Sequence, residues 1–366
     1  MERLSAPAAP RSAAWKWWVC GLLLCASAIN YMDRQTLANA AVRITTQFHL
    51  RQEQYGNLEL VFGWGFAAGS IFFGWLADRW PLRWVYPLVL ALWSATGFAT
   101  GWVGSYSGLL LCRGLLGLFE AGHWPCAIKT TQQLLAPHDR SMGNSLVQGG
   151  ASVGAFLTPL AMNFLLTPEL GSWRPAFQII GALGLVWIVV WLVMIRATDL
   201  TLNRLMVEPS GSSVGEGAVP PAPTTIRTDA EVGPPKPVES APVNGCKPSS
   251  FWPVLCGRRM LVILVIIACI NTCWQTLRAW LPKFLIEGRG YAEADALYFN
   301  SLFFIASDLG CLGAGVLTLW LGRRGWSVHG ARRLVFFGAA ALTALTTCVA
   351  FLPKGWLLLA VLLVIG

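Results

Sequence analysis

The chain has 366 residues, of which 55% are hydrophobic and only 12% are charged. A soluble domain carries about 25% charged residues, so this composition excludes an ordinary soluble protein and favours one that faces lipid. The net charge of +9 does not indicate nucleic-acid binding, because the basic residues stand in short segments between apolar runs, as in membrane proteins.

The ten cysteines show none of the spacings typical of a metal site, and most of them lie in apolar runs. The sequence also lacks an HExxH pair and any convincing Ser-His arrangement. We therefore expect no metal, no cofactor and no enzymatic activity.

Apolar runs of membrane-spanning length follow one another along the chain. A spanning helix needs roughly 20 predominantly apolar residues. The predicted spans are 15–40, 55–77, 84–103, 106–134, 141–166, 174–196, 258–285, 295–321 and 333–352. A tenth begins near Gly355 and runs to Gly366. The sequence thus predicts an all-α membrane protein with nine or ten transmembrane helices.

The positions of lysine and arginine predict the orientation of these spans. Arg79 and Arg83 follow the second span, Arg140 follows the fourth, and Arg323 and Arg324 follow the eighth. Segments on the alternate side are poorer in basic residues, with a few exceptions. The positive-inside rule therefore predicts a cytoplasmic N-terminus in an inner or plasma membrane.

One long polar segment, 199–250, interrupts the pattern and is rich in Pro, Gly and Ser. Such a composition cannot build a packed core and is typical of a flexible linker. It divides the chain into a cytoplasmic tail (1–14), a six-helix bundle (15–198), a cytoplasmic linker (199–250) and an incomplete second bundle (251–366). Two helical bundles joined by a long inner loop are the plan of many secondary transporters.

A weak internal repeat supports this two-bundle plan. The segments 74–83 and 315–324 each follow the second span of their half and share Gly, Leu and a final Arg at equal offsets. Repeats of this kind are expected in transporter folds.

Charged residues inside predicted spans are candidates for function, because a charge at the bilayer centre costs about 2.5–3.5 kcal/mol. Asp33 and Arg34 are adjacent, so they point about 100° apart and can take different partners. Arg113 and Glu120 are nearly two whole turns apart and project from one face. They suit carboxylate binding and proton binding, or they form a fixed structural ion pair. Asp308 is a further candidate for an interior contact.

Other polar residues allow two readings each. Gln148 and Asn271 suit hydrogen bonds to a hydroxylated ligand or between helices. His123 suits a proton, a substrate or simple helix packing. Arg278 suits ligand binding or extension to the interface, and Glu59 lies near enough to a span end to be hydrated.

Several of these segments resemble a known family. The loop 74–83, with Gly74, Asp78, Arg79 and Arg83, resembles the loop signature of the major facilitator superfamily. The segments 29–34 and 113–125 are similar to the first-helix and fourth-helix motifs of its anion:cation symporter family. Further similarity to the hexuronate and sugar-acid branch of that family lies in three short segments, 280–282, 306–310 and 323–332.

The resemblance implies a proton-coupled symporter that moves a hexuronate or related sugar acid by alternating access. It places the protonation sites on Asp33 and Glu120, proton–substrate coupling on Arg34, and carboxylate recognition on Arg113. The polar position of the fifth helix falls on Gln148. Asn271 and His123 complete the expected substrate contacts.

The resemblance also assigns the loop motif, which stabilises the closed cytoplasmic side of the outward-facing state through Asp78, Arg79 and Arg83. The partners implied are a small organic anion, a proton and the lipid bilayer, with the chain acting as a monomer. A sodium-coupled carrier, an exchanger and a non-transporting receptor or sensor are the alternatives.

Four departures from the family pattern stand out. Pro81 replaces a usual glycine, His123 replaces an asparagine common in the sugar-acid branch, and Arg278 is displaced by about one turn from an arginine of the vesicular branch. The family has twelve helices, whereas this chain ends within the predicted tenth, so the sequence predicts an incomplete C-terminal half.

Overall fold

The computed structural model describes residues 12–196, 199–200 and 257–366. Every regular element in these ranges is helical, which confirms the all-α prediction. The predicted linker, 199–250, and the predicted tail, 1–14, lie almost entirely outside the described residues.

The helices before the predicted linker are α1 (Ala13–Asn39), α2 (Ala41–Gln47), α3 (Gln52–Arg79), α4 (Leu82–Thr100), α5 (Tyr106–Glu120), α6 (His123–Leu134), α7 (Arg140–Leu165), the short η1 (Leu170–Ser172) and α8 (Trp173–Met194). Those after it are α10 (Arg258–Lys283), the π-helical η2 (Phe284–Gly288), α11 (Glu293–Arg323), α12 (Val328–Ala344), α13 (Thr346–Val349) and α14 (Trp356–Ile365). Two units are distinguished: Asn203–Cys273, and Met1–Leu202 together with Trp274–Gly366. Below, helices α1 to α8 are called the first bundle, and residues 274–366 are called the C-terminal segment.

Local sequence signals explain where several helices begin. The side chain of Ser12 accepts a hydrogen bond from the backbone N–H of Trp15 at the start of α1. Ser105 caps α5 in the same way through the N–H of Gly108. Serine is a preferred N-cap because its oxygen pairs with an otherwise unpaired backbone donor.

The predicted span 106–134 is interrupted, which corrects the sequence reading. Helix α5 ends at Glu120 and α6 begins at His123. Pro125 has no N–H to donate to the carbonyl of Ala121, so a continuous helix would lose a hydrogen bond at this point. The break follows directly after Glu120, one of the candidate functional residues.

By length and composition, five described helical segments are apolar enough to cross a membrane: Gln52–Arg79, Leu170–Met194, Met260–Gly288, Glu293–Arg323 and Val328–Val349. Trp356–Ile365 is a shorter apolar helix. Helices α1, α4 and α7, and the pair α5 and α6 as a single span, were also predicted to cross the membrane but do not meet this criterion. Helix α1 is less apolar because it carries several polar side chains. These side chains are buried against other helices, where they cost less free energy than they would in contact with lipid.

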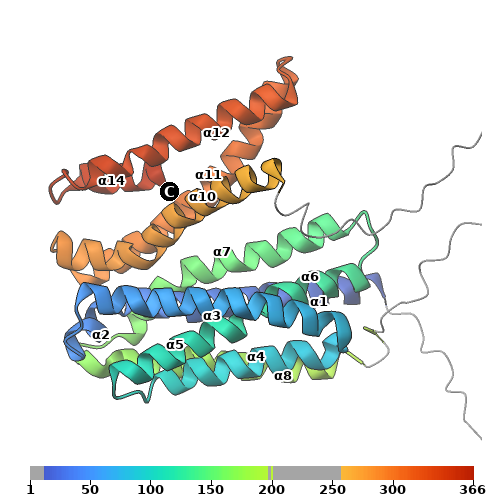
Figure 1. Cartoon of the computed structure of the whole chain (residues 1–366), viewed down its shortest axis with the longest axis horizontal. Coiled ribbons are helices and arrows are strands. Elements are labelled where there is room, and N and C mark those ends of the chain that lie inside the picture. The colour runs from blue at the N-terminus through green and yellow to red at the C-terminus, as the bar shows by residue number, and fades with distance from the viewer. Residues whose placement is uncertain (1–11, 197–198, 201–256) are drawn as a thin grey trace, which may run out of the picture. The chain divides into compact units, whose positions relative to one another are not determined.

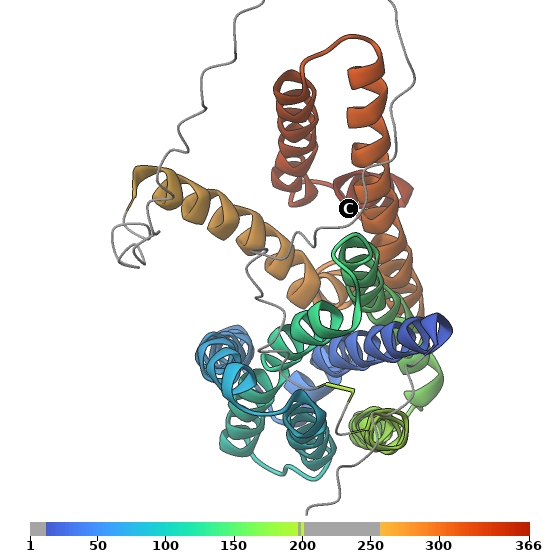
Figure 2. The ribbon, with the colours of Figure 1, turned by 90° about the vertical axis from the view of Figure 1, so that its right-hand side faces the viewer.

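The long helices α1, α3, α4, α5, α7 and α8 run along one common direction (Figure 1). Helix α1 lies along α7, α3 along α5, and α4 along α8, while α11 of the C-terminal segment also lies along α7. Figure 2 shows α1 and α7 side by side from a second direction.

Glycines permit the closest of these approaches. A Cβ atom at Gly150 of α7 would collide with the backbone oxygen of Leu24 in α1, and one at Gly154 would collide with that of Ala28. Small residues at helix interfaces are the usual device for close packing in membranes.

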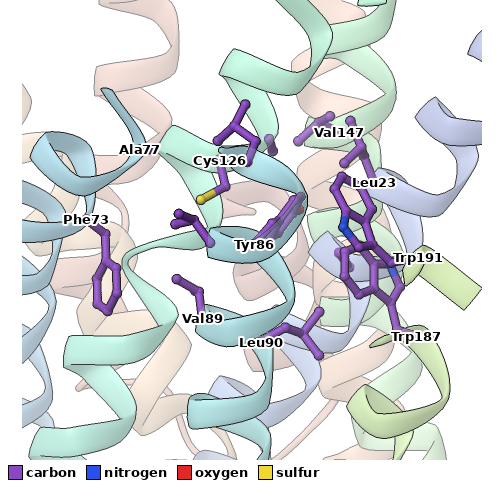
Figure 3. Close-up of a cluster of buried hydrophobic side chains, with 14 of the residues drawn as sticks. Leu23, Phe73, Ala77, Tyr86, Val89, Leu90, Cys126, Val147, Trp187 and Trp191 are labelled. Carbon is purple, nitrogen blue, oxygen red and sulfur yellow. The ribbon is translucent and has the colours of Figure 1, made fainter. Parts of the chain in front are cut away.

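A large apolar cluster holds α1, α3, α4, α6, α7 and α8 together (Figure 3). Tyr86 of α4 packs against Trp187 and Trp191 of α8, with ring centroids 4.9 and 5.0 Å apart. The indole N–H of Trp187 donates to the carbonyl of Leu22 in α1 at 2.7 Å. This rigid bundle fixes the helices that carry the candidate site.

Candidate functional site

The first component of the site is a buried ion pair between α1 and α5. Nε and Nη2 of Arg34 donate to Oε2 of Glu120 at 3.1 and 3.0 Å. The side chains are 7% and 0% exposed, so both charges are removed from water. The other carboxylate oxygen of Glu120, Oε1, has no hydrogen-bond partner among the described residues. An oxygen in that state is available to a proton or to a ligand donor.

Aromatic rings surround the guanidinium of Arg34. Its Cζ lies 5.1 Å from the ring centres of Tyr31 and Phe62 and 4.8 Å from that of Phe66. Cation–π contacts of this kind favour the charged guanidinium at a desolvated position. Asn30, one turn earlier on α1, accepts from Nη2 of Arg34 at 3.5 Å and donates to the backbone oxygen of Glu120 at 3.3 Å.

The second component links α3, α5 and α10 through Glu59. Its Oε1 accepts from Nη2 of Arg113 at 2.9 Å, and its Oε2 accepts from Nη2 of Arg278 at 2.5 Å. The two arginine side chains are 4% and 3% exposed, and that of Glu59 is 14% exposed. Glu59 therefore bridges the first bundle to the C-terminal segment.

This arrangement decides between the two readings left open for the Arg113–Glu120 pair and for Arg278, and it corrects the expectation for Glu59. Arg113 and Glu120 do not form a pair with each other, because each takes a different partner. Arg278 does not extend to the membrane interface but faces inward. Glu59, which was expected to be hydrated, is the residue that sequence reasoning missed. The available signal was a carboxylate within an apolar run, where an unpaired charge is costly.

Asp33 occupies a separate environment from its neighbour Arg34. It is 1% exposed, and neither of its carboxylate oxygens has a hydrogen-bond partner in the part of the chain that the structure describes. A Cβ atom at Gly97 of α4 would lie 3.0 Å from Oδ1 of Asp33, so this side chain points toward α4. The predicted divergence of Asp33 and Arg34 is thus present.

His123 lies in the core of the first bundle with both ring nitrogens occupied. Nε2 is 2.8 Å from Oγ of Ser27, and Nδ1 is 2.9 Å from the hydroxyl oxygen of Tyr86. Because Ser27 donates its own hydrogen to the carbonyl of Leu23, its oxygen accepts from Nε2–H, and Nδ1 accepts from Tyr86. This network satisfies a neutral histidine within the helix packing.

The other expected substrate contacts are less enclosed. Gln148 is exposed on α7. Asn271 is exposed on α10 and donates to the carbonyl of Ile267, one turn earlier, at 3.1 Å. Their roles in substrate binding stay predictions.

The loop motif joins α3 to α4 and pairs within the first bundle. Asp78 forms an ion pair with Lys129 of α6, and the backbone oxygen of Gly74 accepts from the same Nζ at 3.5 Å. The Cζ atom of Arg79 lies 4.5 Å from a ring centre of Trp75, and that of Arg83 lies 5.2 Å from a ring centre of Trp84.

Polar contacts also join the first bundle to α11. The amide of Asn300 donates to Oδ1 of Asn39 at 3.0 Å, and Oγ of Ser152 donates to Oδ1 of Asp308 at 2.7 Å. The interior contact predicted for Asp308 is therefore present.

Apolar helices long enough to cross a membrane, with guanidinium–carboxylate pairs buried between them, are the features of a multi-pass membrane protein. The sequence model of the Major Facilitator Superfamily matches residues 23–366, and the chain belongs to this superfamily.

The chain is similar to several curated transporters. It is 23% identical to a galacturonate transporter of Dickeya chrysanthemi, over 83% of this chain and 81% of that protein. It is 27% identical to a D-galactonate transporter of Escherichia coli O6:H1, over 83% and 67%. It is 23% identical to a hexuronate transporter of Escherichia coli K12, over 82% of this chain and 65% of that protein.

Solved structures show the same fold. A bacterial homolog of the human lysosomal transporter Spinster, in an inward-facing and unoccupied conformation, matches with a TM-score of 0.71 at 19% identity, over 97% of this chain and 72% of that one. A D-xylose–proton symporter matches with a TM-score of 0.63 at 14% identity, over 97% and 79%.

Proposed function

We propose that this protein is a secondary active transporter that carries a small organic anion, a hexuronate or related sugar acid, together with protons. The observation that carries the proposal is the buried Arg34–Glu120 pair, with one carboxylate oxygen of Glu120 left unpartnered. The names of the similar transporters support a sugar acid as the substrate.

Charge balance links the anion to a proton. The buried side chains of this region comprise three guanidiniums and three carboxylates: Arg34, Arg113, Arg278, Asp33, Glu59 and Glu120. A substrate carboxylate adds one negative charge to this balanced set. Uncompensated charge is costly away from water, so uptake of a proton by a carboxylate accompanies substrate binding.

Competition for Arg34 supplies the coupling in this proposal. Deprotonated Glu120 holds the guanidinium through two hydrogen bonds to one oxygen. Protonation removes its negative charge and releases the guanidinium, whose donors then bind an acceptor oxygen of the substrate. Each ligand thereby raises the affinity for the other. Asp33, buried against α4, is the second proposed protonation site.

Contacts at one end of the bundle support an inward-facing state. Nη2 of Arg43 is 2.7 Å from Oε2 of Glu293, the hydroxyl of Tyr55 donates to the carbonyl of Ala279 at 2.8 Å, and Nζ of Lys283 donates to Oγ1 of Thr45 at 2.9 Å. These contacts join the first bundle to the C-terminal segment near the ends of α1 and α10. With the N-terminus in the cytoplasm, this is the outer end, and alternating access requires it to open.

The loop motif fits the same state. Asp78 pairs with Lys129 of its own bundle, so its charge is satisfied without a partner from the C-terminal segment. We propose that this motif engages across the bundles only when the inner side closes. The transporter is proposed to act as a monomer in an inner or plasma membrane.

Uptake into vesicles tests the function. The full chain is reconstituted in liposomes and given labelled glucuronate, galacturonate or galactonate with and without an inward proton gradient. We expect the gradient to accelerate uptake of at least one of these anions. Glu120→Gln, which cannot ionise, should abolish this acceleration while leaving downhill exchange of the same anion measurable.

The alternatives give different results in the same vesicles. Uptake that follows a sodium gradient and ignores protons would indicate a sodium-coupled carrier. Obligatory exchange of one anion for another would indicate an exchanger, and binding without flux would indicate a receptor.

A further inference from the structure

The carboxylate of Glu59 occupies a position between two buried arginines. It is held between two guanidiniums, with one oxygen on Arg113 and the other on Arg278. This bridging of two cations by the two oxygens of one carboxyl group is the contact that guanidinium groups offer an organic acid. The carboxylate here belongs to the protein itself.

The two guanidiniums keep donors that Glu59 does not use. Nε and Nη1 of Arg113 and Nη1 of Arg278 are buried and have no hydrogen-bond partner among the described residues. Buried donors are normally paired, because an unpaired one costs the full desolvation penalty of the group. The two arginines can therefore donate more hydrogen bonds than Glu59 accepts, and this excess indicates that they can bind the acceptor atoms of another anion.

The surroundings fix the arginines more firmly than the carboxylate. The Cζ atom of Arg113 lies 4.5 Å from the ring centre of Phe62, and Nε of Arg278 donates to Oε1 of Gln275 at 2.5 Å. Glu59 has only its two arginine partners and is the most exposed of the three side chains. Glu59 is therefore the member that can leave with the least disruption.

We propose that Arg113 and Arg278 form an anion subsite that Glu59 fills in the absence of substrate, and that a substrate carboxylate replaces it there. A bridging substrate carboxylate needs the same two Nη2 groups that hold Glu59, so the two carboxylates compete for them, and their mutual repulsion adds to this competition. Substrate binding thus detaches Glu59 from Arg113 and Arg278, and with it the direct tie between α3 and α10. Glu59 sets the affinity for the acid by competing with it. This inference rests on the proposed function only in taking the substrate to be a carboxylate.

Anion binding to the purified full chain tests the proposal. Thermal unfolding in detergent is followed while acetate, a minimal carboxylate, or glucuronate is titrated against a constant ionic strength. In Glu59→Gln the two guanidiniums lose their internal anion, so we expect half-maximal stabilisation at about tenfold lower anion concentration than in the wild type. In Arg278→Gln one of the two guanidiniums is lost, so half-maximal stabilisation should need a higher anion concentration than in the wild type.

Glu59→Asp is the matched control because it keeps the negative charge. The competing anion is then still present, and the affinity should not exceed that of the wild type. The proposal would be overturned if Glu59→Gln bound the anion no more tightly than the wild type and Arg278→Gln bound it with unchanged affinity. Glu59, Arg113 and Arg278 would then form a purely structural set of ion pairs. If Glu59→Gln is too unstable to purify, loss of affinity in Arg278→Gln supports the subsite and an unchanged affinity refutes it.

The two readouts separate this inference from the proposed function. Tighter acetate binding by Glu59→Gln in a protein that transports no sugar acid would retain the subsite and remove the sugar-acid substrate. If glucuronate uptake were driven by protons but Glu59→Gln showed no gain in anion affinity, the proposed function would be retained and the competition by Glu59 would be refuted.

Discussion

At the scale of single residues, the decisive fact is how the buried charges are paired. Arg113 and Glu120 lie on one face of α5 but are about 10 Å apart along its axis, which is too far for direct contact. Each is instead paired across a helix interface, Glu120 with Arg34 of α1 and Arg113 with Glu59 of α3. Spacing within one helix predicts the shared face, and the structure excludes the mutual ion pair, which was one of the two readings of these residues.

The His123 network allows a test that separates packing from substrate binding. Tyr86→Phe removes the donor to Nδ1 and leaves a buried acceptor unpaired, which costs about 1–3 kcal/mol of folding free energy. We expect a lower unfolding temperature in detergent and an unchanged Km for uptake of the anion. A changed Km with an unchanged unfolding temperature would instead place His123 in the substrate site, which is one of the roles that the sequence analysis gave it.

At the scale of helices, close approach through glycine sets the packing of α1 on α7. A side chain at Gly150 meets the backbone of Leu24, which cannot move without shifting α1. Gly149, its neighbour on α7, has open space at the same position. The sequence does not distinguish these two adjacent glycines. In the structure Gly150 faces α1, whereas Gly149 faces open space.

Alanine at these two positions should therefore have opposite effects. Gly150→Ala forces the helices apart and should destabilise the protein by about 1–3 kcal/mol. Gly149→Ala should be neutral or stabilise α7 by about 0.5–1 kcal/mol, because alanine is the better helix former. Thermal unfolding of both variants measures the difference, and equal effects would contradict this packing of α1 on α7.

At the scale of the whole molecule, the ion pair between Arg43 and Glu293 is one of the contacts that join the first bundle to the C-terminal segment. Arg43 also donates to the carbonyls of Thr167 and Glu169, so it ties three parts of the chain together. In the proposed cycle these contacts must break whenever the site opens outward.

Weakening this closure should shift the conformational equilibrium. In Glu293→Gln the charge pair is lost, so we expect a larger population with the outer end open. Spin labels at positions 51 and 292 of a cysteine-free chain, read by electron double resonance, should show a longer-distance population in this variant than in its parent. Identical distance distributions would show that the Arg43–Glu293 pair does not control opening.

The sequence by itself determined the class of the protein. Low charge content and repeated apolar runs are properties of the sequence alone, so they can be recognised without coordinates. They also nominated Arg34 and Glu120, since a charge within an apolar run is costly wherever it lies. Only the tertiary structure decided which charges meet, because pairing depends on helices distant in sequence. The same reason explains why Glu59 was overlooked. Its position near the end of a predicted span suggested contact with water, whereas in the structure it is paired with Arg113 and Arg278.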